Sequence, residues 1–309
     1  MSERVAWWAA PGEVRRDVEA LLGGRVVEAV TQPGGYSPGV AARLRLADGR
    51  RAFVKSAGPL PNPDTPGLHR AEARVAAVLP EAAPVPRLLG SFDRDGWVTL
   101  VFEDVDGRQP RLPWDTGELR RVLDALTALA EAMTPSPIEV PSVAERFGGA
   151  FRGWTEPATR DDDLTGLDDW ARRHLGRLAA LESAWGEAAA GRTLVHADVR
   201  ADNLLLTPDR VVVVDWPWAC LAAPWFDLLA MLPSIRLDGG PPPEELFASH
   251  PFARGADADA VTAVVAAVAG YLVRQGRLPS PPGLPTLRAF QRAQGEIALD
   301  WLRARTGWR

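Results

Sequence analysis

The sequence is poor in the residues that build disulfide bonds and zinc sites. One of its 309 residues is a cysteine, Cys220, and four are histidines. A single cysteine excludes an internal disulfide bond and a cysteine-rich metal site. Chains without disulfides are typical of reducing compartments. Residues 1–8 also lack the apolar core of a secretory signal peptide, so we expect a cytoplasmic protein.

Long hydrophobic runs are missing as well. The longest apolar stretch, residues 260–269, contains Thr262 and is shorter than the ~20 residues that a membrane-spanning helix needs. Val261, Val264 and Val268 recur on one face of a helix. The pattern predicts a buried amphipathic helix and no membrane partner.

The charge balance shows no basic excess. The 35 Lys and Arg against 40 Asp and Glu give a net charge of −5, whereas nucleic-acid-binding proteins usually carry a basic surplus. We therefore expect no nucleic-acid partner. The chain is 46% hydrophobic and 24% charged, as ordinary globular proteins are, and its length suits one large or two medium domains.

The first 103 residues have mainly strand character. Strands are predicted at residues 25–31, 40–47, 51–55, 87–92 and 97–102. Asp48-Gly49 predicts a type I′ turn between the second and third strands. A short helix is predicted from Pro11 to Gly23. The main helix is predicted at residues 68–79, after a loop at residues 61–66.

From residue 116 onward the pattern is mostly helical. Helices are predicted at residues 118–133, 167–189, 225–232, 257–275 and 287–305. Proline clusters at residues 241–243 and 279–285 predict loops. The fold class is therefore α+β, with a small β-rich lobe with one main helix (residues 1–103) and a larger, mostly helical lobe (residues 104–309).

Four polar residues in the second lobe have a spacing that is typical of a catalytic site. His196 is followed by Asp198, then by Asn203, and Asp215 ends the apolar run 211–214. Phosphoryl transfer needs a group that accepts the proton of the attacking hydroxyl, followed by two oxygen ligands for Mg²⁺. The order predicts Asp198 as catalytic base and Asn203 and Asp215 as metal ligands. Taken singly, His196 and Asp198 could instead be a chance pair or a metal pair on a loop, Asn203 a turn residue, and Asp215 a strand-end cap.

His196 allows two interpretations, a base or ligand on one side and a structural ring on the other. The chain has no neighbouring His or Cys with which it could form a zinc site. We favour the structural interpretation, in which the ring packs and hydrogen-bonds to hold the loop that carries Asp198.

The first lobe offers groups suited to a nucleotide. Lys55 ends the third strand, and Glu72 on the following helix is better placed than Glu81 to pair with it. The alternative is a solvated Lys and a solvated Glu. Gly35 and Ser37 lie in a glycine-rich loop between the first two strands, where backbone N–H groups can approach phosphates. The alternative there is an ordinary hairpin loop.

The segment after the fifth predicted strand contains Glu103 and Val105. Its backbone groups are predicted to bind the edge of the nucleotide base. A simple linker between the lobes would occupy the same position.

Together these residues resemble the aminoglycoside phosphotransferase and choline kinase-like family, which has the bilobal protein kinase-like fold. The resemblance covers residues 25–235 and is most specific from His196 to Asp215. Ala197 stands where the family usually has Gly, and Ala201 where it usually has Pro. Residues 224–228 resemble a downstream family segment, which implies a structural role for Asp227.

The resemblance implies transfer of the γ-phosphate of ATP, or of GTP, with Mg²⁺, to a small-molecule hydroxyl. Family members act on aminoglycosides, other antibiotics, amino alcohols and sugars. No protein-kinase activation loop follows Asp215, and no obligate protein partner is implied. The nucleotide would bind to the lobe of residues 1–103, and the acceptor to the lobe of residues 104–309.

Two features of the second lobe could bear on the acceptor. Acidic residues 161–163, 168 and 169 could form a rim for a cationic antibiotic, or a solvated turn before a helix. Four of the twelve tryptophans could line a pocket or simply pack in the core: Trp114, Trp154, Trp216 and Trp218.

Two other functions compete with a kinase. One is a catalytically inactive nucleotide-binding module that acts through partners, although such a module needs no complete set of Lys55, Asp198, Asn203 and Asp215. The other is a metal-dependent hydrolase using His196, Asp198 and Asp215, which would lack a second histidine pair.

Overall fold

The computed structural model describes residues 4–32, 38–81, 83–159 and 164–309. The chain divides into two compact units. The first comprises Met1–Pro110, Ala201–Trp218 and Ser280–Leu287, and the second comprises Arg111–Arg200, Ala219–Pro279 and Arg288–Arg309. Each unit is therefore built from segments that are distant in the sequence.

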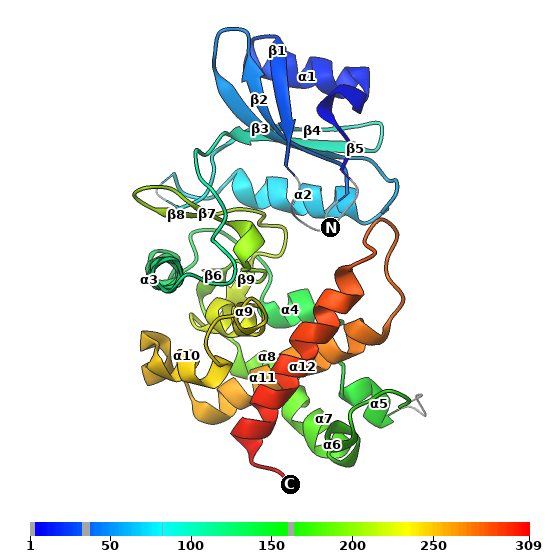
Figure 1. The fold of residues 1–309 in the computed structure, drawn as a ribbon, viewed down its shortest axis with the longest axis vertical. Coiled ribbons are helices and arrows are strands. Elements are labelled where there is room, and N and C mark those ends of the chain that lie inside the picture. Colours follow the sequence, from blue (N-terminus) through cyan, green and yellow to red (C-terminus); the bar gives the residue numbers. More distant parts are fainter. Residues whose placement is uncertain (1–3, 33–37, 82, 160–163) are drawn as a thin grey trace. The chain divides into compact units, whose positions relative to one another are not determined.

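The first unit contains a five-stranded antiparallel sheet (Figure 1). Its strands are β1 (Val26–Thr31), β2 (Val40–Leu46), β3 (Arg51–Ala57), β4 (Leu88–Arg94) and β5 (Trp97–Glu103). Their order in the sheet is β1-β2-β3-β5-β4. The five predicted strands are confirmed, and β3 and β4 extend beyond their predicted ends.

One of the two Asp-Gly hairpin turns in the sheet differs from the prediction. A type I′ turn needs positive φ at both central residues, and Asp95 (φ 52°) and Gly96 (φ 80°) meet this condition between β4 and β5. The predicted type I′ turn at Asp48-Gly49 is wrong, because only Gly49 has a positive φ there. The Gly49 amide donates to Leu46 O and the Leu46 amide to Arg50 O, which is the longer hairpin loop with a glycine bulge.

Alternation along the strands gives the sheet two apolar faces, each covered by a helix (Figure 1). The face towards α1 (Gly12–Leu22) packs side chains of α1 against Leu44 and Val54. The face towards α2 (Thr65–Ala76) packs Ala73 and Ala76 against Leu100 and Phe102. Lys55 is one residue beyond Val54, so it points to the α2 face.

Two helices have, in their first turn, a proline from a segment that the sequence predicts to be a loop. Pro66 lies in the first turn of α2, and Pro243 begins α10 (Pro243–Ser249). Proline is compatible with the first helical turn, because the N–H that it lacks has no partner within the helix there. The predicted loops at residues 61–66 and 241–243 are therefore too long at their ends.

A small hairpin also belongs to the first unit. The 3-10 turn Ala201–Asn203 leads into β7 (Leu204–Leu206), which pairs with β8 (Val211–Val213). All of these strand residues except Leu205 are buried. The hairpin thus fixes the residues at its open end, Asn203 and Asp215.

The second unit is mainly helical. Its long helices are α3 (Thr116–Ala132), α9 (Phe226–Leu237), α11 (Ala258–Arg277) and α12 (Leu287–Thr306, whose first residue falls in the first unit). Shorter elements are α4 (Val143–Phe147), α5 (Thr155–Thr159) and the strand pair β6 (Thr193–Val195) and β9 (Cys220–Ala222). Four predicted helices and the α+β class are confirmed.

The single helix predicted at residues 167–189 is wrong. The segment forms α6 (Asp169–Arg173), α7 (Leu175–Ser183) and α8 (Trp185–Ala188). Before the first break, Trp170 stacks on the ring of Trp308 and donates its indole N–H to the Trp308 carbonyl at 3.0 Å. A contact across 138 positions therefore orients α6 separately from α7, and no local periodicity contains that information.

The predicted amphipathic helix at residues 257–275 is α11. By length and composition, α11 is apolar enough to cross a membrane, but 56% of its apolar window is buried inside the protein. Val261, Val264 and Val268 are all buried, as their spacing predicts. Core helices of soluble proteins pass the same test of length and composition, so it is weak evidence for a membrane span.

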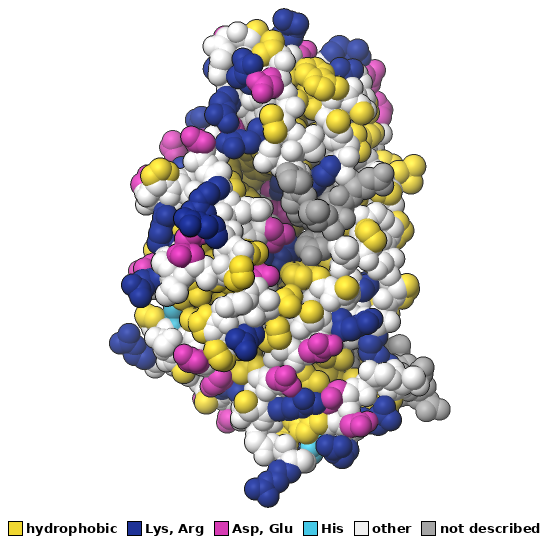
Figure 2. All heavy atoms as spheres, in the orientation of Figure 1, with side chains coloured by type: hydrophobic (Ala, Val, Ile, Leu, Met, Phe, Trp, Pro, Cys, Tyr) yellow, Lys and Arg dark blue, Asp and Glu magenta, His cyan; other side chains and the backbone are white. Residues whose placement is uncertain are grey.

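The surface carries charges of both signs. On the face drawn in Figure 2, basic and acidic side chains are interspersed among apolar and uncharged ones.

Candidate active site

Lys55 is held between two carboxylates in the first unit. Its ammonium Nζ lies 2.9 and 3.0 Å from the two carboxylate oxygens of Glu72 and 2.5 Å from Asp215 Oδ1. Glu72 comes from α2, which covers the face of the sheet to which Lys55 points. Pairing of Lys55 with Glu72 is what the sequence predicts. The bond to Asp215 joins residues 160 positions apart.

Burial and charge oppose each other at this cluster. Burial by itself lowers the pKa of Lys55, but the carboxylates of Asp215 and Glu72 outweigh it and raise that pKa above its ordinary value. Burial raises the pKa of Glu72 to about 7, although Lys55 pulls it down. Lys55 is therefore a fixed positive charge, and Glu72 depends on it for its own negative charge.

Asn203 and Asp215 lie beside each other at the open end of the β7–β8 hairpin. Leu204 pairs with Val213, and the Val214 amide donates to Asn203 O at 3.0 Å. Asp215 has φ 72°, a left-handed conformation that Asp adopts more readily than most residues. One carboxylate and one amide oxygen suit Mg²⁺, which takes few protein ligands and completes its shell with water and phosphate oxygens.

A cavity of about 460 Å³ opens beside this cluster, within the first unit. Its lining includes the predicted nucleotide and metal residues Lys55, Glu72, Glu103, Val105, Asn203 and Asp215. The predicted phosphate-loop residues Gly35 and Ser37 lie outside the described residues. The structure thus collects six predicted residues around one cavity.

Arg4 also lines this cavity, and sequence analysis misses it. The Val5 amide donates to Gly39 O at 3.0 Å, and Arg4 forms a bridge with Gly39, which ties the N-terminal segment to the start of β2. Burial lowers the pKa of Arg4, and the charge of Asp215 opposes that shift. A lone Arg ahead of the first strand gives no sequence signal for such a position.

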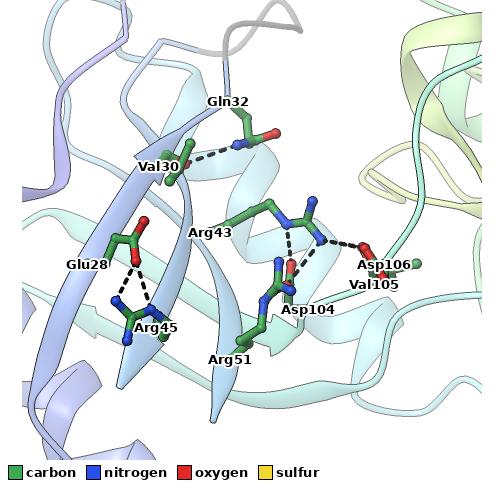
Figure 3. Close-up of polar contacts among 9 residues, drawn as sticks. All are labelled: Glu28, Val30, Gln32, Arg43, Arg45, Arg51, Asp104, Val105 and Asp106. Carbon is green, nitrogen blue, oxygen red and sulfur yellow. Dashed lines mark hydrogen bonds and ion pairs between the residues drawn. The ribbon is translucent and has the colours of Figure 1, made fainter. Parts of the chain in front are cut away.

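A second missed group surrounds the segment that follows β5 (Figure 3). Arg43 on β2 and Arg51 on β3 both point at Asp104. Arg43 Nε lies 2.6 Å from Asp104 Oδ1, and Arg51 Nε lies 2.7 Å from Asp104 Oδ2. The Asp104 side chain is only 4% exposed. An arginine on a strand whose side chains alternate in and out looks like a surface residue in the sequence.

The loop that carries Asp198 belongs to the second unit. Buried Asp227 accepts hydrogen bonds from the backbone amides of His196 (2.8 Å) and Ala197 (2.7 Å). The amide of Asp198 donates to His196 Nδ1 at 3.2 Å. These contacts agree with the structural interpretation of His196 and Asp227. Burial raises the pKa of Asp227 to about 6, against the effect of the two amides.

Asp198 itself is paired. Arg200 Nη1 donates to Asp198 Oδ1 at 2.7 Å, and both side chains are partly exposed, by 18% and 29% respectively. The Arg200 guanidinium also lies over the ring of Phe290, 5.8 Å from its centroid. No sequence pattern points to Arg200, which keeps a positive charge next to the predicted base.

Of the features considered for acceptor binding, Trp216 lines the cavity described above, whereas Asp168 and Trp154 have structural roles. Asp168 caps α6 by accepting from the amides of Trp170 and Ala171, and it pairs with Arg303. Residues 161–163 lie outside the described residues. Trp154 is fully buried and donates to Ala266 O at 2.8 Å.

Comparison with known families identifies the chain. The sequence profile described as "Phosphotransferase enzyme family" matches residues 33–262, about three quarters of the chain. The chain belongs to this phosphotransferase family. No curated protein matches it in sequence.

Solved structures of similar fold accompany this family assignment. A thermostable mutant of the aminoglycoside phosphotransferase APH(4)-Ia, in a ternary complex with ADP and hygromycin B, is 15% identical. The match has a TM-score of 0.64 and covers 96% of this chain and 100% of that one. The choline kinase LicA from Streptococcus pneumoniae is 14% identical, with a TM-score of 0.61 and coverage of 94% and 98%.

An amicoumacin kinase in complex with AMP-PNP, Ca²⁺ and its ligand is 15% identical, with a TM-score of 0.55 and 88% coverage of both chains. At these identities the likeness shows the fold, which is the bilobal protein kinase-like fold. Family membership shows that the chain is a small-molecule phosphotransferase.

Proposed function

We propose that this phosphotransferase transfers the γ-phosphate of ATP, with Mg²⁺, to a hydroxyl of a small molecule. The observation that carries the proposal is the cluster of Lys55, Glu72 and Asp215 at one cavity. A lysine fixed by two carboxylates can bind nucleotide phosphates, and the carboxylate of Asp215 can also be a metal ligand.

Each residue of the cavity has a role in this proposal. Lys55 binds the α and β phosphates, and Glu72 keeps its ammonium in position. Asn203 and Asp215 hold Mg²⁺, which neutralises charge on the phosphates when bound. The backbone of Glu103 and Val105 binds the base. Gly35 and Ser37, which lie outside the described residues, stay sequence predictions for phosphate binding.

Asp198 acts on the acceptor. Its carboxylate accepts a hydrogen bond from the acceptor hydroxyl and orients the oxygen for attack on the γ-phosphorus. The new O–P bond forms as the bond to the bridging oxygen of ADP breaks, and the hydroxyl proton passes to Asp198. Arg200 donates to Asp198 Oδ1 in the structure and so holds this carboxylate in place.

The acceptor class is an aminoglycoside or other antibiotic, an amino alcohol or a sugar. The similar structures include an aminoglycoside phosphotransferase in complex with hygromycin B, a choline kinase and an amicoumacin kinase, and these names support a small hydroxylated acceptor. Antibiotic resistance would follow from an antibiotic acceptor. The retained set of Lys55, Asp198, Asn203 and Asp215 speaks against an inactive module. A cytoplasmic location and the absence of an obligate protein partner stay predictions.

The test is release of ADP from ATP across a panel of aminoglycosides, macrolides, peptide antibiotics, amino alcohols and sugars. One class should stimulate release, and Asp198→Asn should reduce turnover about 100-fold or more, since a positioned base contributes about 10²–10⁴, while ADP still binds. Asp209→Asn is the matched control, because Asp209 lies in the exposed β7–β8 turn. Chelation of Mg²⁺ should abolish turnover in the wild type.

Three results would contradict the proposal. Equal function of wild type and Asp198→Asn would favour the inactive module. Phosphate release without any acceptor would favour the hydrolase. A protein that binds no adenine nucleotide with Mg²⁺ would exclude both the kinase and the module.

A further inference from the structure

In the segment after β5, the backbone N–H of Val105 is available to a nucleotide base, whereas its carbonyl is already hydrogen-bonded. We propose that Arg43 makes this enzyme select adenine over guanine nucleotides, by occupying the backbone carbonyl of Val105. The proposal rests on the proposed nucleotide site, because Val105, Glu103 and Arg43 all line the same cavity.

The carbonyl of Val105 accepts two hydrogen bonds. Arg43 Nη2 donates to it at 2.9 Å, and the Gly107 amide donates to it at 2.9 Å (Figure 3 shows the contact with Arg43). A carbonyl oxygen has two lone pairs, so both are used. Within the described part of the chain, the Val105 amide donates to no backbone or side-chain acceptor. Val105 thus offers a base a donor and withholds its acceptor.

The two purines differ in what they need at such a position. The Watson–Crick edge of adenine has an acceptor at N1 beside the donor N6–H₂, so one backbone amide and a neighbouring carbonyl satisfy it. Guanine has the acceptor O6 beside the donor N1–H. To use Val105, guanine would take the amide with O6 and then place N1–H on the carbonyl of the same residue. That carbonyl is already filled, and an unpaired buried donor costs about 1–3 kcal/mol.

The arrangement also resists a shift of the segment. Arg43 binds both oxygens of Asp104, at 2.6 and 3.2 Å, and Arg51 binds Asp104 from β3 at 2.7 Å. Paired arginine–carboxylate contacts of this kind are strong and directional, and the Asp104 side chain is almost fully buried. Guanine therefore cannot gain an acceptor by moving the segment without breaking two ion pairs.

The three arginines of β2 and β3 provide matched variants. Arg43→Ala removes both the Val105 contact and one partner of Asp104. Arg51→Ala removes a partner of Asp104 and leaves the Val105 carbonyl occupied. Arg45 is on the same strand as Arg43, and Arg45→Ala removes only its exposed ion pair with Glu28 (Figure 3). Only the first should change the choice of base.

The experiment is calorimetric titration of ADP and of GDP, with Mg²⁺, into the wild type and the three variants. The wild type should bind ADP at least tenfold more tightly than GDP. Arg43→Ala should reduce this preference by roughly tenfold, the value of one net hydrogen bond. Arg51→Ala and Arg45→Ala should keep the preference, even where Arg51→Ala weakens both nucleotides. Thermal unfolding establishes that each variant is folded.

Other results overturn the inference. Equal binding of ADP and GDP by the wild type removes its basis. Equal weakening of both nucleotides by Arg43→Ala, with the preference intact, assigns Arg43 a purely structural role. Loss of preference in Arg51→Ala assigns selectivity to rigidity of the segment. Should Arg43→Ala not fold, Arg43→Met gives the same comparison, because methionine is unbranched and has no N–H to donate to the Val105 carbonyl. Because binding needs no acceptor, absence of turnover contradicts the proposed function alone.

Discussion

The ammonium of Lys55 lies 2.5 Å from Asp215 Oδ1, and this contact brings a strand of the sheet to the open end of the β7–β8 hairpin. The same ammonium binds Glu72, whose side chain is 3% exposed. One lysine therefore pairs with two carboxylates and balances the charge of only one of them. Nucleotide phosphates and a metal would relieve the same cluster by sharing these charges.

Replacement of Lys55 by Met should affect both stability and nucleotide binding. Removing one partner of a buried ion pair destabilises by about 3–5 kcal/mol, because the remaining charge is buried without compensation. The double variant Lys55→Met/Glu72→Gln should recover part of that loss. Chemical denaturation of the single and double variants, with ADP titrations alongside, measures both effects. A double variant as unstable as the sum of its parts would show that Lys55 and Glu72 are not coupled.

Arg4 should contribute to nucleotide binding. Its guanidinium lines the cavity near Asp215, where the phosphates of a nucleotide would lie. Arg4→Ala should raise the KM for ATP about tenfold, the value of a charge-assisted hydrogen bond, and leave the KM for the acceptor unchanged. Arg16→Ala is the control, since its side chain is 71% exposed. An unchanged KM for ATP would place Arg4 outside the nucleotide site.

The buried carboxyl of Asp227 should give stability a defined pH dependence. Its pKa is about 6 in the folded protein, against 3.8 as the ordinary value. Between these values the folded state binds more protons than the unfolded state, so this group's contribution to stability falls as pH rises from about 4 to 6. The fall is about 3 kcal/mol, at 1.36 kcal/mol per pKa unit, and the contribution is constant above that window.

Comparison with Asp227→Asn isolates this group. Burial lowers the pKa of His69 to about 4, so the contribution of His69 to stability rises with pH. The pH dependence of wild-type stability therefore combines two opposite contributions. The quantity to measure is the difference in unfolding free energy between wild type and Asp227→Asn at pH 4, 5, 6 and 7. A difference that rises with pH, or does not change, would contradict the assignment.

Ala197 should be less favourable than glycine at its position. It has φ 64°, a left-handed conformation that costs a non-glycine residue about 1–2 kcal/mol. Glycine avoids that cost but loses about 0.5–1 kcal/mol more backbone entropy on folding, so Ala197→Gly should stabilise by about 0.5–1 kcal/mol. Ala125→Gly within α3 is the control and should destabilise by a similar amount. Urea denaturation distinguishes the two signs.

Local pattern was sufficient for much of the fold. Alternating side chains locate the five strands, and apolar residues three and four positions apart locate α3, α11 and α12. The local pattern failed to predict where a helix ends when a distant contact determines its end. The helix break after Trp170, which stacks on Trp308, is an example. It also chose the wrong hairpin for the type I′ turn, because Asp-Gly occurs in both and only the strand register shows which turn has two central residues.

In the candidate site, too, some residues follow from local sequence and others from contacts between distant segments. The spacing of His196, Asp198, Asn203 and Asp215 is a property of the sequence, because a loop and a tight hairpin fix their relative positions along the chain. Lys55 and Glu72 follow from strand alternation and the helix that comes next. The family assignment is consistent with these predictions, while the roles of the individual residues stay predictions.

Only the tertiary structure placed Arg4, Arg43 and Arg200. Arginine is common on protein surfaces. Nothing in a single sequence distinguishes a solvated arginine from one that lines a cavity or donates a hydrogen bond to a buried carbonyl. What the sequence determined by itself is the set of groups that carry the chemistry, since these need particular residue types at particular spacings. The fold decided which arginine side chains surround these groups, because their burial and their contacts depend on packing between segments far apart in the chain.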